Sequence, residues 1–137
     1  MECSPGTFVY WDRGYQLGCP EQPFEPAAFL LTRVISHPTE NTWCLDLGHK
    51  SVAAESEISK RVYFPELEGY TPVSQSEEHL VLESRNNASA LQPGDVVTGV
   101  PWHICPTVAL YERVICVENG NVSGEWQNWA RDRKRGI

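Results

Sequence analysis

The sequence predicts a mainly β domain, an antiparallel barrel or sandwich with one or two short helices. Short β-branched and aromatic runs recur along the chain, separated by turns rich in Gly, Pro and Asn. Asn119-Gly120 lies between two alternating runs, which indicates a β-hairpin, because a type I′ turn needs positive φ at both central residues. The chain shows no internal repeat and no domain linker. We therefore expect residues 1–137 to form one β domain.

The first third of the chain predicts a strand, a loop and a hairpin. Residues 7–11 are aromatic and β-branched and follow a Pro-Gly turn signal, which predicts a strand. Residues 12–26 are rich in Gly, Pro and Gln and predict a long loop. The apolar run 28–36 predicts a strand that Pro38 ends, and residues 42–47 return as its hairpin partner.

The middle of the chain predicts a short helix followed by strands. Residues 51–59 are the best helix candidate because they contain several Ala and Glu residues. We expect strands over 62–64, 71–76, 80–82 and 96–100. They are joined by turns at 65–69 and 91–95 and by a polar loop at 85–90.

The last part of the chain predicts a hairpin and a polar tail. Residues 111–118 and 121–129 are the two strands around the Asn-Gly turn. The tail from 131 to 135 is basic, and we expect it to be solvated.

Composition excludes several classes of protein. At 137 residues, with 41% hydrophobic and 21% charged residues, the chain has the composition of one globular domain. A net charge of −7 argues against nucleic acid or an anionic membrane as a main partner. No apolar run approaches the length of a membrane span, and no basic-then-apolar leader begins the chain. We expect a cytoplasmic protein.

The cysteines do not form a disulfide or zinc-ribbon pattern. There are five, at irregular spacings, and no CxxC occurs. We expect reduced thiols. Cys44 and Cys116 lie within apolar strand-like runs, which favours positions in the core.

One pair of residues has the chemistry of a metal site. His103 and Cys105 follow the strand predicted at 96–100. In an extended backbone, side chains two residues apart point to the same face, so the imidazole and the thiol would converge. These are the ligand types that zinc prefers. Zinc ordinarily takes four ligands, so water, substrate or another polypeptide would have to supply the others.

The pair also has a purely structural interpretation. Free Cys is among the most buried residue types, and a single His beside apolar residues is usually packed and hydrogen-bonded. Pro101 and Pro106 bracket the pair and stiffen its backbone, which favours a preorganised functional turn. On the residues alone, both interpretations stay open.

Motifs of the common enzyme families, such as GxSxG, the P-loop, GxGxxG and HExxH, do not occur. A series of six longer segments is more informative. In order, they are PGTFVYWD at 5–12, LDLGHK at 45–50, SEEHL at 76–80, GDVV at 94–97, PWHICPT at 101–107 and WARDR at 129–133. Together they resemble the C-terminal domain of the D-threonine aldolase and D-serine dehydratase family, alanine-racemase-like enzymes of fold type III.

The resemblance implies a metal-dependent pyridoxal-phosphate enzyme. In that family an N-terminal (β/α)8 barrel holds pyridoxal phosphate on a lysine, and a His-x-Cys or His-x-Asp pair of the C-terminal domain holds a divalent metal. The metal contacts the β-hydroxyl of a D-3-hydroxy amino acid, for retro-aldol cleavage or β-elimination. His103 and Cys105 match this pair. A thiolate ligand favours zinc, with manganese as the other possibility.

The barrel of the family is absent from this sequence. It needs about 250 residues, and Lys50, Lys60 and Lys134 lie outside the cofactor-binding context of the family. We expect the chain to be an excised or truncated C-terminal domain that does not turn over alone. Its expected partners are its own barrel, a second subunit in a homodimer and a D-amino acid. The competing hypothesis is a stand-alone, non-catalytic β binding module.

Further polar residues are secondary candidates. The segment 46–50 could face the barrel or the active site of a partner subunit. Glu78-His79 could orient a metal ligand, although a strand-edge hydrogen bond is the favoured interpretation. We expect His37 at the surface and the tryptophans Trp102, Trp126 and Trp129 in the core or in an interface.

Overall fold

The computed structural model describes residues 2–3, 6–84 and 91–132, and its secondary structure is mostly strand. The elements in chain order are η1 (Thr7–Val9), α1 (Arg13–Gly18), β1 (Leu30–Thr39), β2 (Thr42–Leu45), η2 (Ile58–Lys60), β3 (Val62–Tyr63), β4 (Tyr70–Gln75), β5 (Leu80–Ser84), β6 (Val96–Pro101), α2 (Ile104–Val108), β7 (Arg113–Glu118) and β8 (Asn121–Gln127). Here η denotes a 3-10 helix.

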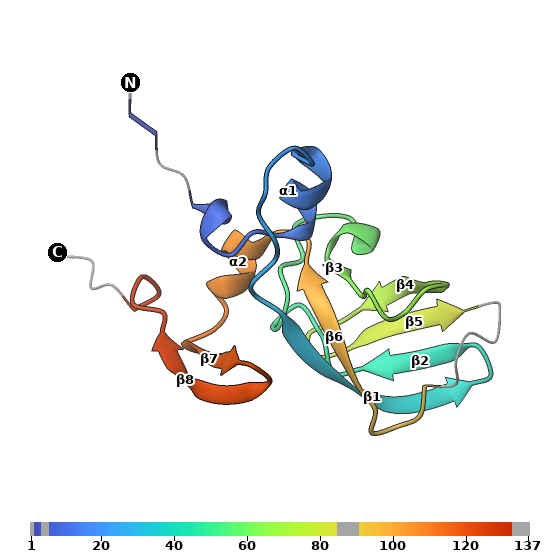
Figure 1. The fold of residues 1–137 in the computed structure, drawn as a ribbon. Coiled ribbons are helices and arrows are strands. Elements are labelled where there is room, and N and C mark those ends of the chain that lie inside the picture. Colours follow the sequence, from blue (N-terminus) through green and yellow to red (C-terminus); the bar gives the residue numbers. More distant parts are fainter. Residues whose placement is uncertain (1, 4–5, 85–90, 133–137) are drawn as a thin grey trace, which may run out of the picture.

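Six strands form one curled sheet in the order β3-β6-β1-β2-β5-β4. Every neighbouring pair in the sheet is antiparallel. In Figure 1 the sheet curves through β1 so that β6 and β3 turn away from β2, β5 and β4. The predicted fold class is confirmed: the domain is mainly antiparallel β, with two short α-helices.

The long strand β1 produces this curl. Its first half, Leu30 to Arg33, pairs with β6, and its second half, from Val34, pairs with β2. The pairing with β2 contains register shifts, one of them between Ser36 and Thr39. Such irregularities bend a strand and increase its twist. They also explain why β1 continues past Pro38, where we expected it to end, because the ladder pairs Ser36 and Thr39 and leaves the proline out.

The core lies on one face of the curled sheet. Leu45, Leu80 and Leu82 are fully buried there, and Trp43 donates its indole N–H to the Leu91 carbonyl. Strands β2 and β5 show the alternation that one buried face requires. Burial of these leucines is the main force that holds the sheet together.

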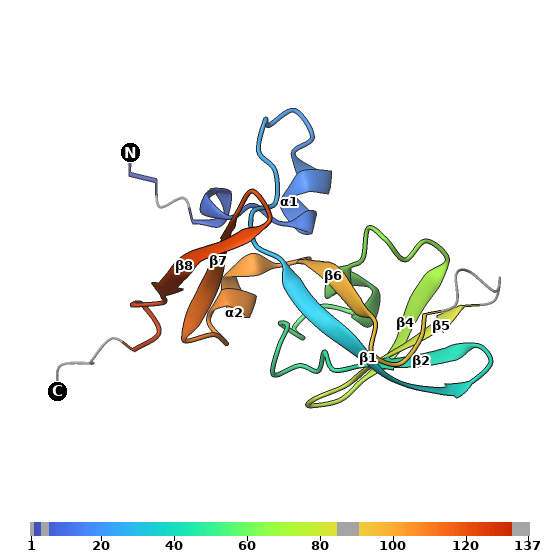
Figure 2. The same ribbon diagram turned by 60° about the horizontal axis from the view of Figure 1, so that its bottom comes forward.

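A separate two-stranded sheet follows α2. β7 and β8 form a hairpin whose turn, Asn119-Gly120, has φ values of 51° and 78°. The predicted Asn-Gly turn is confirmed. In Figures 1 and 2 the hairpin lies beside α2, away from the six-stranded sheet. Along β8, every residue is exposed.

Two predicted elements near the N-terminus are wrong. Residues 7–11 form the 3-10 helix η1 and a turn, in which the Thr7 carbonyl accepts from Trp11 N–H, and no described strand pairs with them. The predicted loop at 12–26 contains α1, which begins at the N-cap residue Asp12. Amino-acid composition does not predict so short a helix, because its stability comes from its N-cap and from tertiary contacts.

The predicted helix at 51–59 is also wrong. The segment forms turns, and only residues 58–60 become helical, as η2. Val52 is fully buried, and Ala53 N–H donates to the Thr107 hydroxyl. These tertiary contacts outweigh the helix propensity of a short Ala- and Glu-containing stretch.

The remaining predicted strands and turns agree with the structure, within one or two residues at their ends. The polar loop at 85–90 and most of the basic tail lie outside the described residues. All five cysteines are free, as expected, although Cys44 and Cys116 are half-buried rather than in the core. Burial raises the pKa of the Cys44 thiol.

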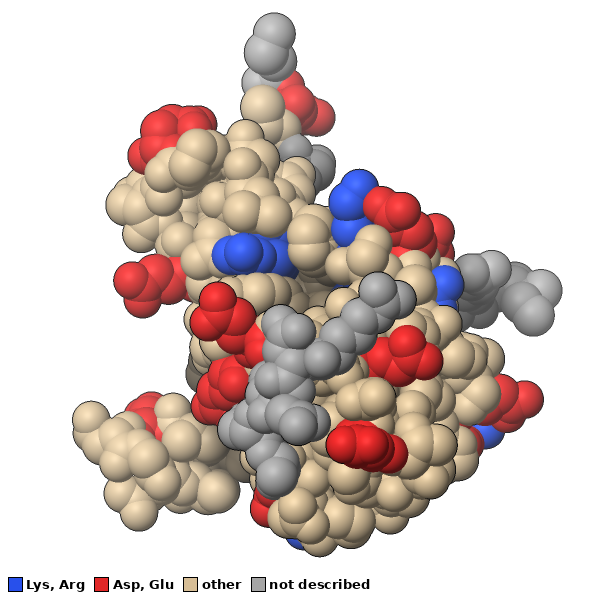
Figure 3. Space-filling view, turned by 90° about the vertical axis from the view of Figure 1, so that its right-hand side faces the viewer, with Lys and Arg blue, Asp and Glu red and all other residues tan. Residues whose placement is uncertain are grey.

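The surface agrees with the acidic composition. On the face that Figure 3 shows, Asp and Glu side chains are spread widely and Lys and Arg are few. Within the described part of the chain, no helix is long and apolar enough to cross a membrane.

Candidate metal centre

The ligand turn, residues 103–105, leads from β6 into α2: His103 lies in the connection and Cys105 in the first turn of the helix. His103 is the N-cap residue with extended backbone, and α2 begins at the next residue, Ile104. The prediction of an extended segment through Cys105 is therefore wrong. Successive residues of a helix are rotated by about 100°, so a spacing of two no longer places both side chains on one face by itself. Pro106 is compatible with this geometry because it lies in the first turn of α2. N–H groups of a first turn have no acceptor within the helix, so a proline there removes no helical hydrogen bond.

Asp12 anchors the start of α2 from the other end of the chain. Its side chain is buried, with one carboxylate oxygen accepting from Ile104 N–H at 2.9 Å. The other oxygen accepts from Tyr15 N–H at 2.8 Å and caps α1. One carboxylate thus satisfies the free N–H groups of two helices, which binds the N-terminal segment to the candidate site.

Close backbone packing holds the residue before the ligand turn. Trp102 donates its N–H to the Arg61 carbonyl and accepts from Gly14 N–H, both at 3.0 Å. A Cβ atom on Gly14 would lie 2.9 Å from the Trp102 carbonyl oxygen, so this approach requires glycine. Just before Asp12, the buried Trp11 has a φ of 55°, a strained value for a bulky residue.

The His103 ring is hydrogen-bonded through one nitrogen. Its Nδ1 lies 2.7 Å from Glu55 Oε1, and both side chains are about half exposed (48% and 45%). Within the described residues this is the ring's sole recorded partner, so Nε2 is available to an outside group. When Nδ1 of a histidine ring is held in this way, Nε2 is the atom whose lone pair can bind a metal.

The Cys105 thiol is exposed and hydrogen-bonded to the N-terminal segment. Its Sγ lies 3.2 Å from Thr7 Oγ1. On the buried side of the same helix, Thr107 donates its hydroxyl to the His103 carbonyl at 2.8 Å and accepts from Ala53 N–H. Hydrogen bonds of the buried Thr107 therefore hold the backbone of the ligand turn, while the side chains of His103 and Cys105 are exposed to solvent.

This donor set fits a partial zinc site. A nitrogen and a sulfur, both accessible, match the ligands that zinc prefers. Across the described ranges, no three His, Cys, Asp or Glu side chains lie close enough together to hold a metal. Within the described residues, His103 and Cys105 would therefore supply two of the four ligands that zinc ordinarily takes.

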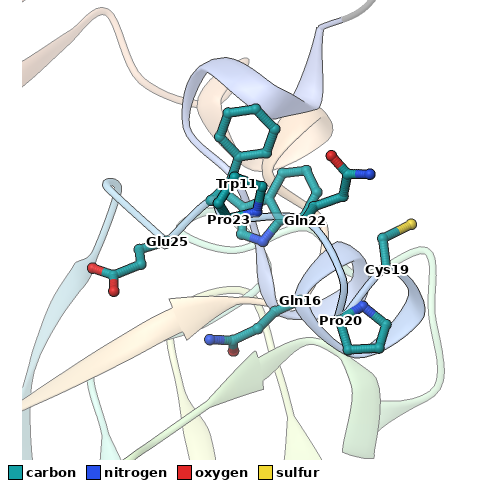
Figure 4. A pocket seen from close by; sticks show the side chains of 8 residues that line it. Trp11, Gln16, Cys19, Pro20, Gln22, Pro23 and Glu25 are labelled. Atoms are coloured by element: carbon teal, nitrogen blue, oxygen red, sulfur yellow. The ribbon is translucent and has the colours of Figure 1, made fainter.

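Two hollows of about 320 Å³ lie around α1, and one of them reaches the turn that carries His103. The first is lined by Trp11, by Gln16 of α1 and by residues between 19 and 25, which follow α1 (Figure 4). The other includes the candidate ligand His103 together with Trp102, and Cys19 contributes to both. The residues that line the hollow beside His103 are Asp12, Gly14, Tyr15, Gly18, Cys19, Ser56, Trp102 and His103. A small ligand that reached His103 would meet α1 on one side.

The secondary candidates lie elsewhere. Glu78 pairs with Lys50 at 2.7 Å, so its carboxylate serves that ion pair instead of a metal ligand. His79 is exposed and directly precedes β5, and its carbonyl accepts from Ser76 N–H at 2.9 Å, which agrees with the favoured strand-edge hydrogen bond. His49 is exposed beside Lys50, so the role of 46–50 toward a barrel stays a prediction.

The tryptophans and His37 take different environments from one another. His37 is exposed as expected, but it lies in β1 and stacks on Trp43 with 4.5 Å between ring centroids. Trp102 is half-buried, whereas Trp126 and Trp129 are exposed. A role of the last two in an interface remains a prediction.

Glu55, Thr7 and Asp12 were not among the predicted site residues. Each is distant in sequence from the ligand turn and reaches it only through the fold. The PGTFVYWD and PWHICPT segments that carry the family resemblance contain Thr7, Asp12 and both candidate ligands, and that shared signal could have linked them. Nothing in the sequence around Glu55 marks it.

Sequence comparisons relate the chain to D-3-hydroxy amino acid enzymes. The profile of a family described as "Putative serine dehydratase domain" matches residues 27–117. A D-threonine aldolase from Arthrobacter sp. is 32% identical over 136 residues, which is 98% of this chain and 35% of that protein. A 3-hydroxy-D-aspartate aldolase from Paracoccus denitrificans (strain Pd 1222) is 31% identical over 110 residues, 80% of this chain and 27% of that protein. The chain thus spans about a third or less of the length of these relatives.

Solved structures share the fold. D-threonine aldolase from Filomicrobium marinum matches with a TM-score of 0.81 and 26% identity over 93% of this chain and 35% of that one. D-threo-3-hydroxyaspartate dehydratase from Delftia sp. HT23 matches with a TM-score of 0.65 and 18% identity over 90% of this chain and 38% of that one. The D-threo-3-hydroxyaspartate dehydratases that match also include a cysteine-to-alanine variant in the metal-free form and a histidine-to-alanine variant. The two replaced positions lie two residues apart.

Proposed function

Because the chain belongs to the serine dehydratase domain family, we propose that it is the C-terminal, metal-ligand-carrying domain of a pyridoxal-phosphate-dependent enzyme acting on D-3-hydroxy amino acids. The observation that carries the proposal is the turn from β6 into α2. Its backbone is held by Asp12 and Thr107, while the side chains of His103 and Cys105 stay accessible. A rigid backbone with two exposed zinc-type ligands is what a half-site requires.

The ligand roles follow from the contacts of each side chain. His103 would bind the metal through Nε2, since Nδ1 is occupied by Glu55. Cys105 would bind it as a thiolate, which can only accept hydrogen bonds, so the Thr7 hydroxyl would then donate to the sulfur. When bound, the metal supplies a Lewis acid that polarises the β-hydroxyl of the substrate. The sulfur ligand favours zinc over manganese.

The cofactor would be held by the rest of the enzyme. A Schiff base with pyridoxal phosphate needs an uncharged lysine amine. Lys50 is ion-paired with Glu77 and Glu78, which raises the pKa of its ammonium group, and Lys60 is paired with Glu57. Lys134 lies outside the described residues. Both described lysines are engaged in surface ion pairs, which favours a cofactor lysine in the rest of the enzyme.

An apolar surface is available for the missing part of the enzyme. Val117 and Val122 face each other across the β7–β8 hairpin, and they are 62% and 72% exposed. Trp126 and Trp129 add further exposed apolar area. Surfaces of this kind usually mark an interface, and we assign this one to the barrel domain or to a second subunit of a homodimer.

The related proteins catalyse two types of reaction: some are aldolases and others are dehydratases. Aldolases dominate the sequence matches, whereas a replaced cysteine is associated with a metal-free form in a dehydratase. Cys105 is compatible with the dehydratase branch, and the overall identity favours the aldolase branch. We place retro-aldol cleavage first and β-elimination second.

A zinc titration by calorimetry at neutral pH tests the proposal. We expect saturable but weak binding to this chain, because two protein ligands do not complete a zinc site. His103→Ala and Cys105→Ser should each remove it. His49→Ala and Cys116→Ser are matched controls away from the site and should bind as the unchanged chain does.

Two outcomes would contradict the metal role. Binding that persists in both the His103 and Cys105 variants would place the metal elsewhere. Absence of binding, together with a loss of stability in both variants, would favour the competing hypothesis of a non-catalytic β module in which the pair is structural.

A further inference from the structure

Glu55 reaches the candidate ligand from a turn that is itself firmly held. Val52 is fully buried, and the N–H groups of Ser51 and Val52 both donate to the Gly48 carbonyl. On the other side of Glu55, the Arg61 guanidinium donates through Nε to the Ser56 carbonyl at 2.8 Å. The carboxylate is therefore presented by a fixed backbone and not by a free loop.

The Glu55 turn and the His103 turn are also joined to each other. The Thr107 hydroxyl donates to the His103 carbonyl and accepts from Ala53 N–H, two residues before Glu55. Thr107 is buried, and both bonds are partly buried. Thr107 therefore fixes the distance between the two backbone segments that carry Glu55 and His103, independently of the contact between those two side chains.

We propose that Glu55 is the positioning residue of the site: it holds the ring proton of His103 on Nδ1 and so presents the lone pair of Nε2 for ligation. The inference rests on the proposed metal role of His103. A neutral imidazole binds a metal through one nitrogen, and a carboxylate on the opposite N–H fixes both the tautomer and the ring orientation and makes the ligand more basic. The 2.7 Å contact between Nδ1 and Oε1 is the geometry of that arrangement.

Glu57 provides the matched control. It lies two residues from Glu55 on the same segment, is also exposed and pairs with Lys60 at 2.6 Å, away from His103. A general effect of removing one negative charge from this segment should appear equally in Glu57→Ala. An effect on the ring should appear only in the Glu55 variants.

Two measurements on this chain test the proposal. Nitrogen-15 NMR of the His103 ring in the metal-free chain, at about pH 8 where an imidazole is ordinarily neutral, should show the proton on Nδ1. Glu55→Ala should move the ring toward the other tautomer, and Glu55→Gln, which keeps an acceptor oxygen, should move it less. In a zinc titration, Glu55→Ala should lower the affinity about 10- to 100-fold, with Glu55→Gln in between.

The outcomes separate this inference from the proposed function. Unchanged ring shifts and a zinc affinity within about twofold of the parent chain in Glu55→Ala would overturn the role of Glu55 and leave the metal role intact. A tautomer shift in Glu55→Ala, in a chain whose zinc binding persists in His103→Ala and Cys105→Ser, would support Glu55 as the group that fixes the ring and overturn the metal role. Loss of binding in Glu55→Gln as complete as in His103→Ala would make Glu55 a ligand and overturn its assignment as a positioning residue.

Discussion

The six-stranded sheet and the β7–β8 hairpin are built from the same kind of sequence and reach opposite states of burial. Leu80 and Leu82 on β5 are fully buried under the curl of the sheet. Val117 and Val122 on the hairpin are just as apolar, but no described element covers them. One face of the sheet is buried within the described residues, although Leu31 and Val96 on its other side are 75% and 50% exposed. The apolar surface of the hairpin would be buried only by another body.

The candidate site lies between these two regions. α2 connects the end of β6 to the hairpin, and Asp12 holds its first turn from the N-terminal side. Tyr111, just before β7, donates its hydroxyl to the Ser51 carbonyl at 2.7 Å. In the proposed function, the sheet and Asp12 would hold the candidate ligands next to the exposed hairpin.

The largest expected difference between the regions is in the cost of removing an apolar side chain. Leu82→Ala should lower the free energy of unfolding by about 2–5 kcal/mol, because it opens a cavity in the packed core. Ile115→Ala, on the exposed hairpin, should cost less than about 1 kcal/mol. Chemical denaturation of the two variants measures this, and equal losses would show that the hairpin is buried in solution.

Removing the cap shared by the two helices should have the next largest effect. Asp12→Ala leaves the buried Ile104 N–H and the Tyr15 N–H without their acceptor, which should cost about 1–3 kcal/mol. Asp12→Asn keeps one acceptor oxygen and should lose less. Denaturation midpoints of both variants test this, and a change below about 0.5 kcal/mol in Asp12→Ala would show that the junction does not depend on the carboxylate.

Tyr111→Phe should have a smaller, pH-dependent effect. At neutral pH the loss of the hydrogen bond to Ser51 should cost about 1 kcal/mol. Burial raises the pKa of the Tyr111 hydroxyl, so its contribution is complete below the unfolded value of about 10 and is lost as the pH rises through the folded value. Thermal unfolding from pH 7 to pH 11 should therefore show the advantage of tyrosine shrinking above about pH 10. A constant difference would contradict it.

The smallest effect on stability should come from the outer face of the hairpin. Replacing both Val117 and Val122 by Thr keeps the β-branched shape and should change stability by no more than about 0.5 kcal/mol. Self-association, measured by analytical ultracentrifugation, should fall because apolar surface is lost. Unchanged association would move the interface to another face.

The strands were predictable because their signals are local. The alternation of β5, the apolar run of β1 and the Asn-Gly turn of the hairpin all depend on residues a few positions apart. The mispredicted segments depend instead on residues that are distant in sequence. Residues 7–11 look like a strand but have no neighbour to pair with, and residues 51–59 look helical but are held in turns by Val52 and Ala53.

The candidate site divides in the same way. His103 and Cys105 were found from their chemistry, because imidazole and thiol are identifiable wherever they stand. Their backbone was mispredicted as extended, since the helix start at Ile104 depends on an acceptor 92 positions away, Asp12. Glu55 was missed for the same reason, as 48 positions separate it from His103.

By itself, the sequence determined the β class, the hairpin turn, the free cysteines, the family resemblance and the identity of the two candidate ligands. Tertiary structure alone decided the curl of the sheet, the helix under Cys105, the Glu55 contact and the exposed face of the hairpin. The physical reason is the range of the interactions. Backbone preferences and donor chemistry belong to a few neighbouring residues, whereas burial and long-range hydrogen bonds exist only once distant segments have been brought together.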